Sequence, residues 1–184
     1  MDASPDLGPL APFLGSWEGD KGTDLAPGAD RTPATSLYRE RIAFAPLGRV
    51  DNHEQVLHGL TYTTMAWRLG AADGFHQETG YLLWDAARQQ VMRCFLVPRG
   101  MALIAGGTVL PDARTFTLKA TLGSPTYGIC SNPFLDIEFK TVAFEITLAI
   151  DGDTLRYDQD TVLQMKGREA LFHHTDRNTL RRIG

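Results

Sequence analysis

The chain has 184 residues, of which 43% are hydrophobic and 22% are charged, and its formal net charge at pH 7 is -4. This balance is typical of a soluble globular protein with one sizeable core, so we expect a single domain over residues 1–184. Binding to nucleic acid requires a basic stripe. The short cluster Arg177, Arg181 and Arg182 is the nearest approach to one and is interpreted as a solvated face, so we expect no nucleic-acid partner.

The sequence also predicts the compartment. No apolar run approaches the roughly 18 residues of a membrane span, and the first residues lack the basic and apolar regions of a signal peptide. Cys94 and Cys130 have no CxxC spacing, and one pair gives no disulfide framework. We therefore predict a cytoplasmic protein with reduced thiols and no membrane partner.

The N-terminal segment is predicted to hold a flexible end, a plug and a first strand. Residues 1–6 are typical of a frayed terminus. Apolar residues interleaved with two prolines between positions 7 and 14 predict a short helical turn that covers one end of a barrel. The Gly-Ser-Trp-Glu-Gly run at 15–19 suits a strand that bends sharply, with Trp17 as a core anchor.

The next segment predicts a loop followed by two strands. Residues 23–36 are rich in Pro, Gly, Asp and Ala, which predicts an exposed loop. Strands are expected at 37–44 and 54–68, with a turn at 51–53.

The middle of the chain predicts three more strands, at 75–84, 89–97 and 101–107. On the first of these, His76 and Glu78 share a face because side chains alternate along a strand. The pair fits either a hydrogen-bonded core pair or part of a functional site.

Residues 115–122 alternate cleanly, as expected of a strand with one buried face. The rhythm breaks at 123–140, which we interpret as a loop-like segment with a functional role because long loops seldom persist without one. Residues 142–150 and 154–165 then form a predicted hairpin around the Asp-Gly-Asp turn at 151–153.

The last segment, residues 169–182, contains the adjacent pair His173 and His174. In a strand, His174 shares a face with Phe172, while His173 faces the other way. An imidazole that faces an apolar cavity requires a partner such as a metal, a buried polar group or a ligand. The alternative is a polar stretch at the chain's end. The two rings cannot bind one metal together, because they point to opposite faces.

About ten short strands, turns every 8 to 12 residues and no long amphipathic helix predict an all-β antiparallel fold. We favour a single up-and-down β-barrel, calycin-like in form, because closure leaves no exposed edge strand.

Three segments together resemble the nitrobindin family. They are Leu-Gly-Ser-Trp-Glu-Gly at 14–19, Phe-His-Gln-Glu-Thr-Gly-Tyr at 75–81, and Leu-Phe-His-His at 171–174 followed by Leu-Arg-Arg at 180–182. The Tyr-Arg-Glu-Arg-Ile run at 38–42 is similar to the second strand of that family. The matches occur in the family's order and span most of the chain.

The resemblance implies a ten-stranded barrel, similar to fatty-acid-binding proteins, that holds ferric haem b through a histidine of the last strand. It further implies an interaction with nitric oxide, isomerisation of peroxynitrite to nitrate, and a homodimer. Carried over to this sequence, His174 is the expected axial ligand to the metal, with His173 as the fallback. His76 is expected on the other side of the haem, and Phe172 and Trp17 are expected to contact the cofactor.

The chain departs from the family pattern at three places. The glycine-rich continuation that leads to a Tyr-Pro-Thr element is replaced by residues 23–36, and the spacing from the histidine pair to Leu180 is one residue longer than expected. Residues 127–134 match nothing typical of the family. Two alternatives therefore stay open: a haem-free barrel that binds a small apolar or fatty-acid-like ligand, and a filled barrel that acts through a partner surface. No Gly-x-Ser-x-Gly elbow supports a serine hydrolase.

Overall fold

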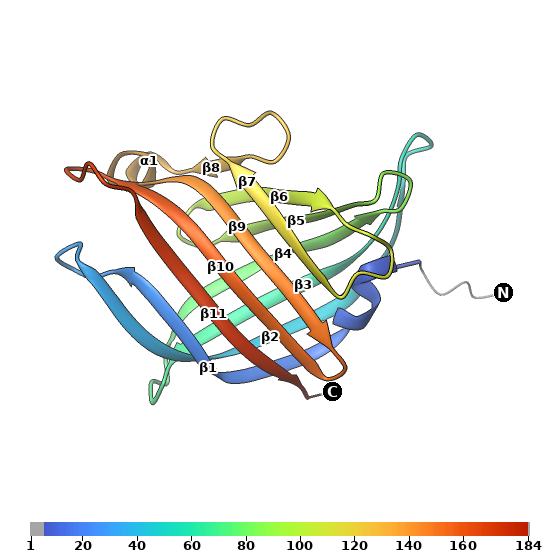
Figure 1. Cartoon of the computed structure of the whole chain (residues 1–184), viewed down its shortest axis with the longest axis horizontal. Helices are drawn as coiled ribbons and strands as arrows, with labels where there is room; N and C mark the ends of the chain where they lie inside the picture. The colour runs from blue at the N-terminus through green and yellow to red at the C-terminus, as the bar shows by residue number, and fades with distance from the viewer. Residues whose placement is uncertain (1–5, 184) are drawn as a thin grey trace.

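The computed structural model describes residues 6–183, in which ten antiparallel strands close into a barrel (Figure 1). Neighbouring strands follow the order β5-β4-β3-β2-β1-β11-β10-β9-β7-β6, and the pairing of β5 with β6 closes the ring. The predicted all-β barrel of about ten strands is confirmed. Residues 1–5, which hold most of the terminus predicted to be flexible, lie outside the described residues.

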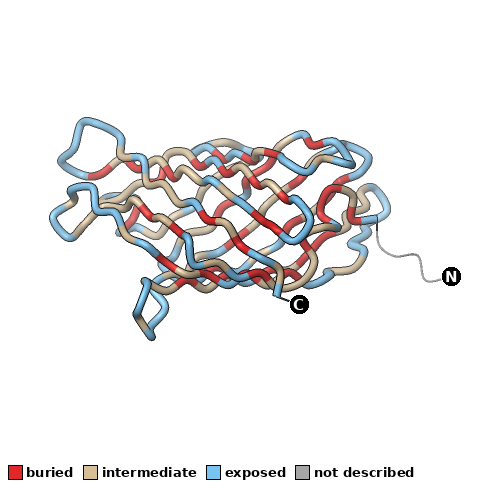
Figure 2. Tube along the Cα trace, turned by 60° about the horizontal axis from the view of Figure 1, so that its bottom comes forward, coloured by how far each residue is buried: buried red, intermediate tan, exposed pale blue. Residues whose placement is uncertain are grey.

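The elements in chain order are η1 Gly8–Phe13, β1 Gly15–Pro27, β2 Pro33–Asp51, β3 Val56–Arg68, β4 Gly74–Asp85, β5 Gln90–Val97, β6 Met101–Thr108, β7 Thr115–Thr121, β8 Ile129–Ser131, α1 Pro133–Glu138, β9 Phe139–Asp151, β10 Thr154–Met165 and β11 Phe172–Arg182. Buried and exposed residues alternate along the strands (Figure 2), as expected when one face lines the barrel and the other faces water. Within residues 6–183, no helix has the length and apolar character required to cross a membrane.

One end of the barrel is closed by η1, the helical turn predicted from the prolines and apolar residues near the N-terminus. Phe13 is fully buried, and its ring centroid lies 5.7 Å from that of Phe44 and 5.8 Å from that of Phe116. The indole nitrogen of Trp17 donates a hydrogen bond of 2.7 Å to the carbonyl oxygen of Phe13. This contact fixes the plug against the start of β1.

The prediction of an exposed loop at residues 23–36 is wrong. β1 extends to Pro27 and β2 begins at Pro33, so only residues 28–32 connect them. Asp24 pairs with Ser36 of β2 on one side and with Asp176 of β11 on the other. Pairing with two neighbouring strands outweighs the weak strand propensity of the local sequence.

The segment at 123–140, predicted to be loop-like, contains regular structure. β8 pairs with β6, and the Asn132 side chain caps α1 by accepting a hydrogen bond of 2.9 Å from the backbone nitrogen of Leu135. Pro133 stands at the first helical position, where its missing donor costs nothing. α1 lies at the end of the barrel opposite η1 (Figure 1).

An ion-pair cluster joins three segments at this open end. Arg31 Nη2 lies 2.6 Å from Glu138 Oε2, and Lys166 Nζ lies 2.8 Å from Glu138 Oε1. The three residues come from the β1–β2 connection, from α1 and from the β10–β11 turn. The cluster therefore ties the rim of the barrel together.

We expect Phe13→Ala to lower the free energy of unfolding by roughly 3 to 5 kcal/mol, because it removes a buried ring from the plug and leaves a cavity. Urea unfolding followed by tryptophan fluorescence measures the change. Phe134, which is 58% exposed on α1, provides the matched control, and Phe134→Ala should cost less than about 1 kcal/mol. Equal losses for both variants would contradict a structural role for the plug.

Candidate functional site

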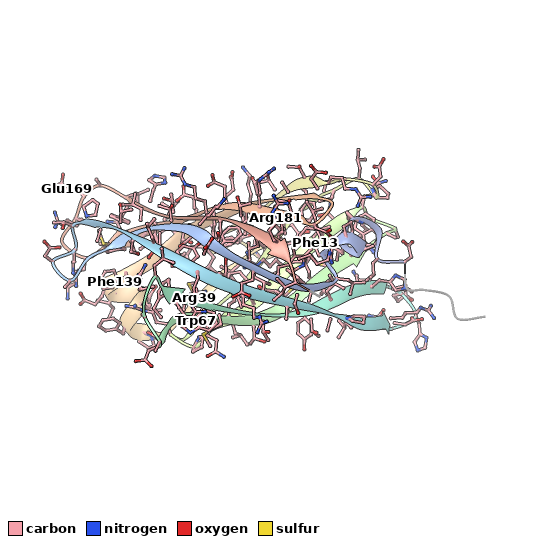
Figure 3. All side chains as sticks on the ribbon, turned by 90° about the horizontal axis from the view of Figure 1, so that it is seen from below. Phe13, Arg39, Trp67, Phe139, Glu169 and Arg181 are labelled. Atoms are coloured by element: carbon pink, nitrogen blue, oxygen red, sulfur yellow. The ribbon has the colours of Figure 1, made fainter. Side chains whose placement is uncertain are left out.

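A cavity of about 830 Å³ occupies the barrel between the plug and the open end. Its lining reaches the rim residues Gly28, Phe75, Pro98 and Leu135. Figure 3 shows Phe13 toward one end of the barrel and Phe139 and Glu169 toward the other. The cavity is large enough for a small-molecule ligand, since such sites enclose about 300 to 1,000 Å³.

The cavity has two chemically different walls. One is apolar and comes mainly from β5, β9 and β10; it includes Phe95, Phe144, Ile146, Leu148 and Leu163. The other comes mainly from β1 to β4 and β11 and carries polar and charged side chains. These are Asp24, Tyr38, Glu40, Tyr62, Arg68, His76, Glu78, Arg93, Tyr157, Gln159, His174 and Asp176.

His174 lines the cavity from β11, and two carboxylates hold its ring. Its Nε2 atom lies 3.0 Å from Asp24 Oδ1 and 3.4 Å from Asp176 Oδ2. Nε2 donates the hydrogen bond to Asp24, because an ionised carboxylate only accepts. Nδ1 makes no hydrogen bond to any residue that the structure describes, so this nitrogen is available to a ligand.

Asp24 anchors this arrangement. It is only 2% exposed, its Oδ2 atom lies 2.6 Å from Arg68 Nη1, and the hydroxyl of Ser36 donates to the same oxygen at 3.2 Å. Burial raises the pKa of Asp24, but His174 and Arg68 outweigh burial and hold it below the ordinary value. The carboxylate is therefore ionised and orients the imidazole.

The acidic neighbours also set the protonation of the site. Burial lowers the pKa of His174, but the hydrogen bond to Asp24 and the charge of Asp176 raise it above its ordinary value. Burial and the nearby charge of Asp24 raise the pKa of Asp176 to about 6, against the opposing effect of His174. One imidazole and two carboxylates thus form a single coupled cluster.

Asp24 is the site residue that sequence reasoning missed. A β-bulge shifts the pairing of β1 between Gly19 and Gly22, so the inward face changes from odd to even positions. Trp17 and Asp24 both point inward for this reason, although an uninterrupted strand would place them on opposite faces. Counting from Trp17 could not have identified Asp24.

The remaining predicted site residues lie in different places. His76 lines the cavity, with Nε2 3.8 Å from Glu78 Oε2. His173 faces outward, and its Nδ1 lies 2.6 Å from Asp160 Oδ2. Phe172 is half-buried and Trp17 is fully buried at the closed end, and neither lines the cavity. The cavity therefore brings together His174 and His76 only.

Deeper in the polar wall, Glu78 and Arg93 form a buried ion pair, with Arg93 Nη2 2.6 Å from Glu78 Oε1. Tyr62 donates to the same carboxylate oxygen and accepts a hydrogen bond of 2.8 Å from Arg93 Nε. Burial opposes ionisation of Glu78, but Arg93 and the hydrogen bonds keep its pKa below the ordinary value. Every charge in this group has a partner.

Glu40 is also buried, with 5% of its surface exposed. Its Oε2 atom accepts hydrogen bonds of 2.8 Å from the Tyr157 hydroxyl and 3.1 Å from Asn178 Nδ2. Burial raises the pKa of Glu40 to about 7, against the opposing effect of those two hydrogen bonds. The cavity wall therefore contains a carboxyl group that changes charge near neutral pH.

The comparison with known proteins identifies the family. Residues 6–182 match the family described as "THAP4-like, heme-binding beta-barrel domain". The chain belongs to the nitrobindin family of haem-binding β-barrels. The predicted family is therefore confirmed, and haem is the cofactor that this membership supports.

Two relatives show how far the similarity extends. A "Peroxynitrite isomerase" from Nocardia farcinica (strain IFM 10152) is 30% identical over 176 residues, which cover 92% of this chain and 87% of the relative. The crystal structure of Rv2717c from M. tuberculosis aligns over 100% of both chains with a TM-score of 0.72 and 26% identity. The nitrobindin likeness thus extends along nearly the whole chain.

We expect the stability of the wild type, relative to Glu40→Gln, to fall as pH rises. The pKa of Glu40 is about 7 in the folded chain against an ordinary value of 4.5, so the folded state binds this proton more tightly. The resulting stabilisation is full below about pH 4.5 and is lost as pH rises through about 7, a change of roughly 3 kcal/mol at most. Urea unfolding of both proteins across this window measures it, and parallel pH profiles would contradict the assignment.

Proposed function

We propose that this nitrobindin-family chain binds ferric haem through His174 and that the loaded protein interacts with nitric oxide and isomerises peroxynitrite to nitrate. The observation that carries the proposal is the orientation of the histidine pair. His174 faces the cavity with a nitrogen free of protein partners, whereas His173 faces outward and pairs with Asp160.

The residues of the cavity fit a haem. An apolar wall with Phe95 and Phe144 can cover the macrocycle, and His174 supplies an imidazole, the common axial ligand of haem iron. A ligating histidine usually donates its other ring nitrogen to a carboxylate, and Asp24 accepts such a bond. The ligand atoms of Asp24, His174 and Asp176 lie within 4.8 Å of one another, so the second carboxylate adds further negative charge beside the ring.

Each residue has a distinct role in this proposal. Bound haem would supply a ferric iron at which nitric oxide or peroxynitrite can bind. His174 binds the cofactor, and Asp24 holds the proton on Nε2 and fixes the ring. Arg68 balances the charge of Asp24, and the apolar wall limits the access of water.

The comparisons support the proposal at two levels. Membership of a haem-binding barrel family supports the cofactor, and the name of the Nocardia farcinica relative supports the reaction. The axial ligand, the interaction with nitric oxide and the homodimer implied by the resemblance are predictions.

We expect hemin titration of the wild type to give a sharp Soret band at one equivalent, and we expect His174→Ala to abolish it because the axial nitrogen is lost. Addition of nitric oxide to the loaded wild type should shift that band. The matched control is His173→Ala, which removes the adjacent imidazole from the outer face and should leave the titration unchanged.

Two results would overturn this assignment. One is an unchanged Soret band in His174→Ala, and the other is loss of the band in His173→Ala alone. Circular dichroism of both variants establishes that each retains the barrel.

A further inference from the structure

We propose that the deep part of the cavity is a binding subsite for an organic cation, a protonated amine on an apolar body, with Glu40 as its counterion. This inference concerns a different layer of the barrel from His174 and does not depend on the axial ligand.

The hydrogen bonds of Glu40 leave one of its oxygens free. Tyr157 and Asn178 both donate to Oε2, and no residue that the structure describes donates to Oε1. Asp160 Oδ1 is the one fully buried side-chain oxygen or nitrogen without a partner within residues 6–183. Glu40 Oε1 also lacks a partner, so it is not fully buried. It is therefore open to the cavity that the Glu40 side chain lines. The carboxyl group is held rigidly by one oxygen and presents the other to a ligand.

Glu40 also lacks the cation that every other carboxylate of the cavity has. Asp24 pairs with Arg68, Glu78 pairs with Arg93, and Asp176 lies beside His174. Among the described residues, no Lys, Arg or His nitrogen forms an ion pair with Glu40, and His76, whose charge acts on Glu40 through space, pairs with Glu78. An unpaired carboxylate away from bulk water is costly, so a ligand that brings a positive charge gains more here than at the paired groups.

The surroundings of Glu40 suit a cation on an apolar body. The hydroxyl of Tyr157, which donates to Glu40, lies 2.6 Å from the hydroxyl of Tyr38, and both rings line the cavity. Aromatic faces attract cations. Ile42 follows Glu40 as the next inward residue of β2, and Leu155 is the inward neighbour of Tyr157 on β10. Both line the cavity. An alkyl or aryl group attached to the amine would therefore contact apolar side chains.

Tyr38 can lie against the wall because Gly22 has no side chain. A Cβ atom at Gly22 would clash with the Tyr38 ring. The bulge of β1 places this glycine beside Tyr38, with which it pairs. The strand irregularity thus accommodates one ring of the proposed subsite.

Strand geometry separates this subsite from the His174 layer. Ser36 pairs with Asp24, and Glu40 lies four residues farther along β2 toward the closed end. At about 3.3 Å per residue, the two layers are roughly 13 Å apart along the strand. The subsite also disfavours a fatty acid, because the ligand's carboxylate would face the like charge of Glu40.

The test compares three ligands that share one alkyl chain: octylamine, octanol and octanoate. Each is titrated calorimetrically into the full chain without hemin, at mildly alkaline pH, so that Glu40 is ionised and the amine is protonated. We expect octylamine to bind at least about tenfold more tightly than octanol, with octanoate weakest, because a hydrogen bond to a charged group adds that much affinity.

Two variants test whether the preference for the amine depends on Glu40. Glu40→Gln should lower the affinity for octylamine by about tenfold or more and leave octanol unchanged, since only the charge is removed. Glu145→Gln provides the control, because Glu145 lies on the outer face in a pair with Lys119. Thermal unfolding checks that Glu40→Gln folds. If this variant does not fold, the comparison of the three ligands on the wild type still tests the proposal.

The inference is overturned if the wild type binds octanol or octanoate as tightly as octylamine, or if folded Glu40→Gln keeps the preference for the amine. Because no hemin is present, these results are distinguishable from failure of the haem proposal, which the Soret titration decides.

Discussion

The hydrogen bond between Asp24 and His174 joins the two ends of the chain at the point where the barrel closes. β1 and β11 are the first and last strands, and their pairing brings a residue near the start beside one near the end. With Arg68 on its other oxygen, Asp24 holds the imidazole on the cavity side. The haem proposal depends on this contact, because it holds the ring in one orientation where a flat ligand can reach it.

The cost of burying charge explains how the other side chains of the polar wall are paired. Glu78, Arg93 and Tyr62 satisfy one another, so this group contributes rigidity without a free site. Glu40 differs because two neutral donors hold it and no Lys, Arg or His among residues 6–183 forms an ion pair with it. The same wall therefore contains paired groups that shape the cavity and one unpaired group that can respond to a ligand.

Much of the architecture could be predicted from the sequence because alternation along a strand is a local signal. The regular pattern at 142–150 and the Asp-Gly-Asp turn located β9 and β10, and period-2 spacing separated the faces of His173 and His174. The role of Asp24 could not be predicted, because the bulge in β1 reverses the inward face and the local composition is that of a loop. The helix α1 was missed because six residues are too short for a helical period to show.

The partners of Glu40 were equally hidden from sequence reasoning. Tyr157 and Asn178 lie more than 100 positions away and reach Glu40 only through closure of the barrel. Such contacts depend on register across several strands, and no single segment encodes them. The sequence thus identified most of the strands, whereas contacts between distant strands bring the side chains of the cavity wall together.

A crystal structure of the hemin-loaded protein would show directly which imidazole binds the iron. We expect haem inside the cavity, with its iron bonded to a ring nitrogen of His174 and with Asp24 still hydrogen-bonded to the other nitrogen. Iron bonded to His173, or haem held outside the barrel, would contradict it.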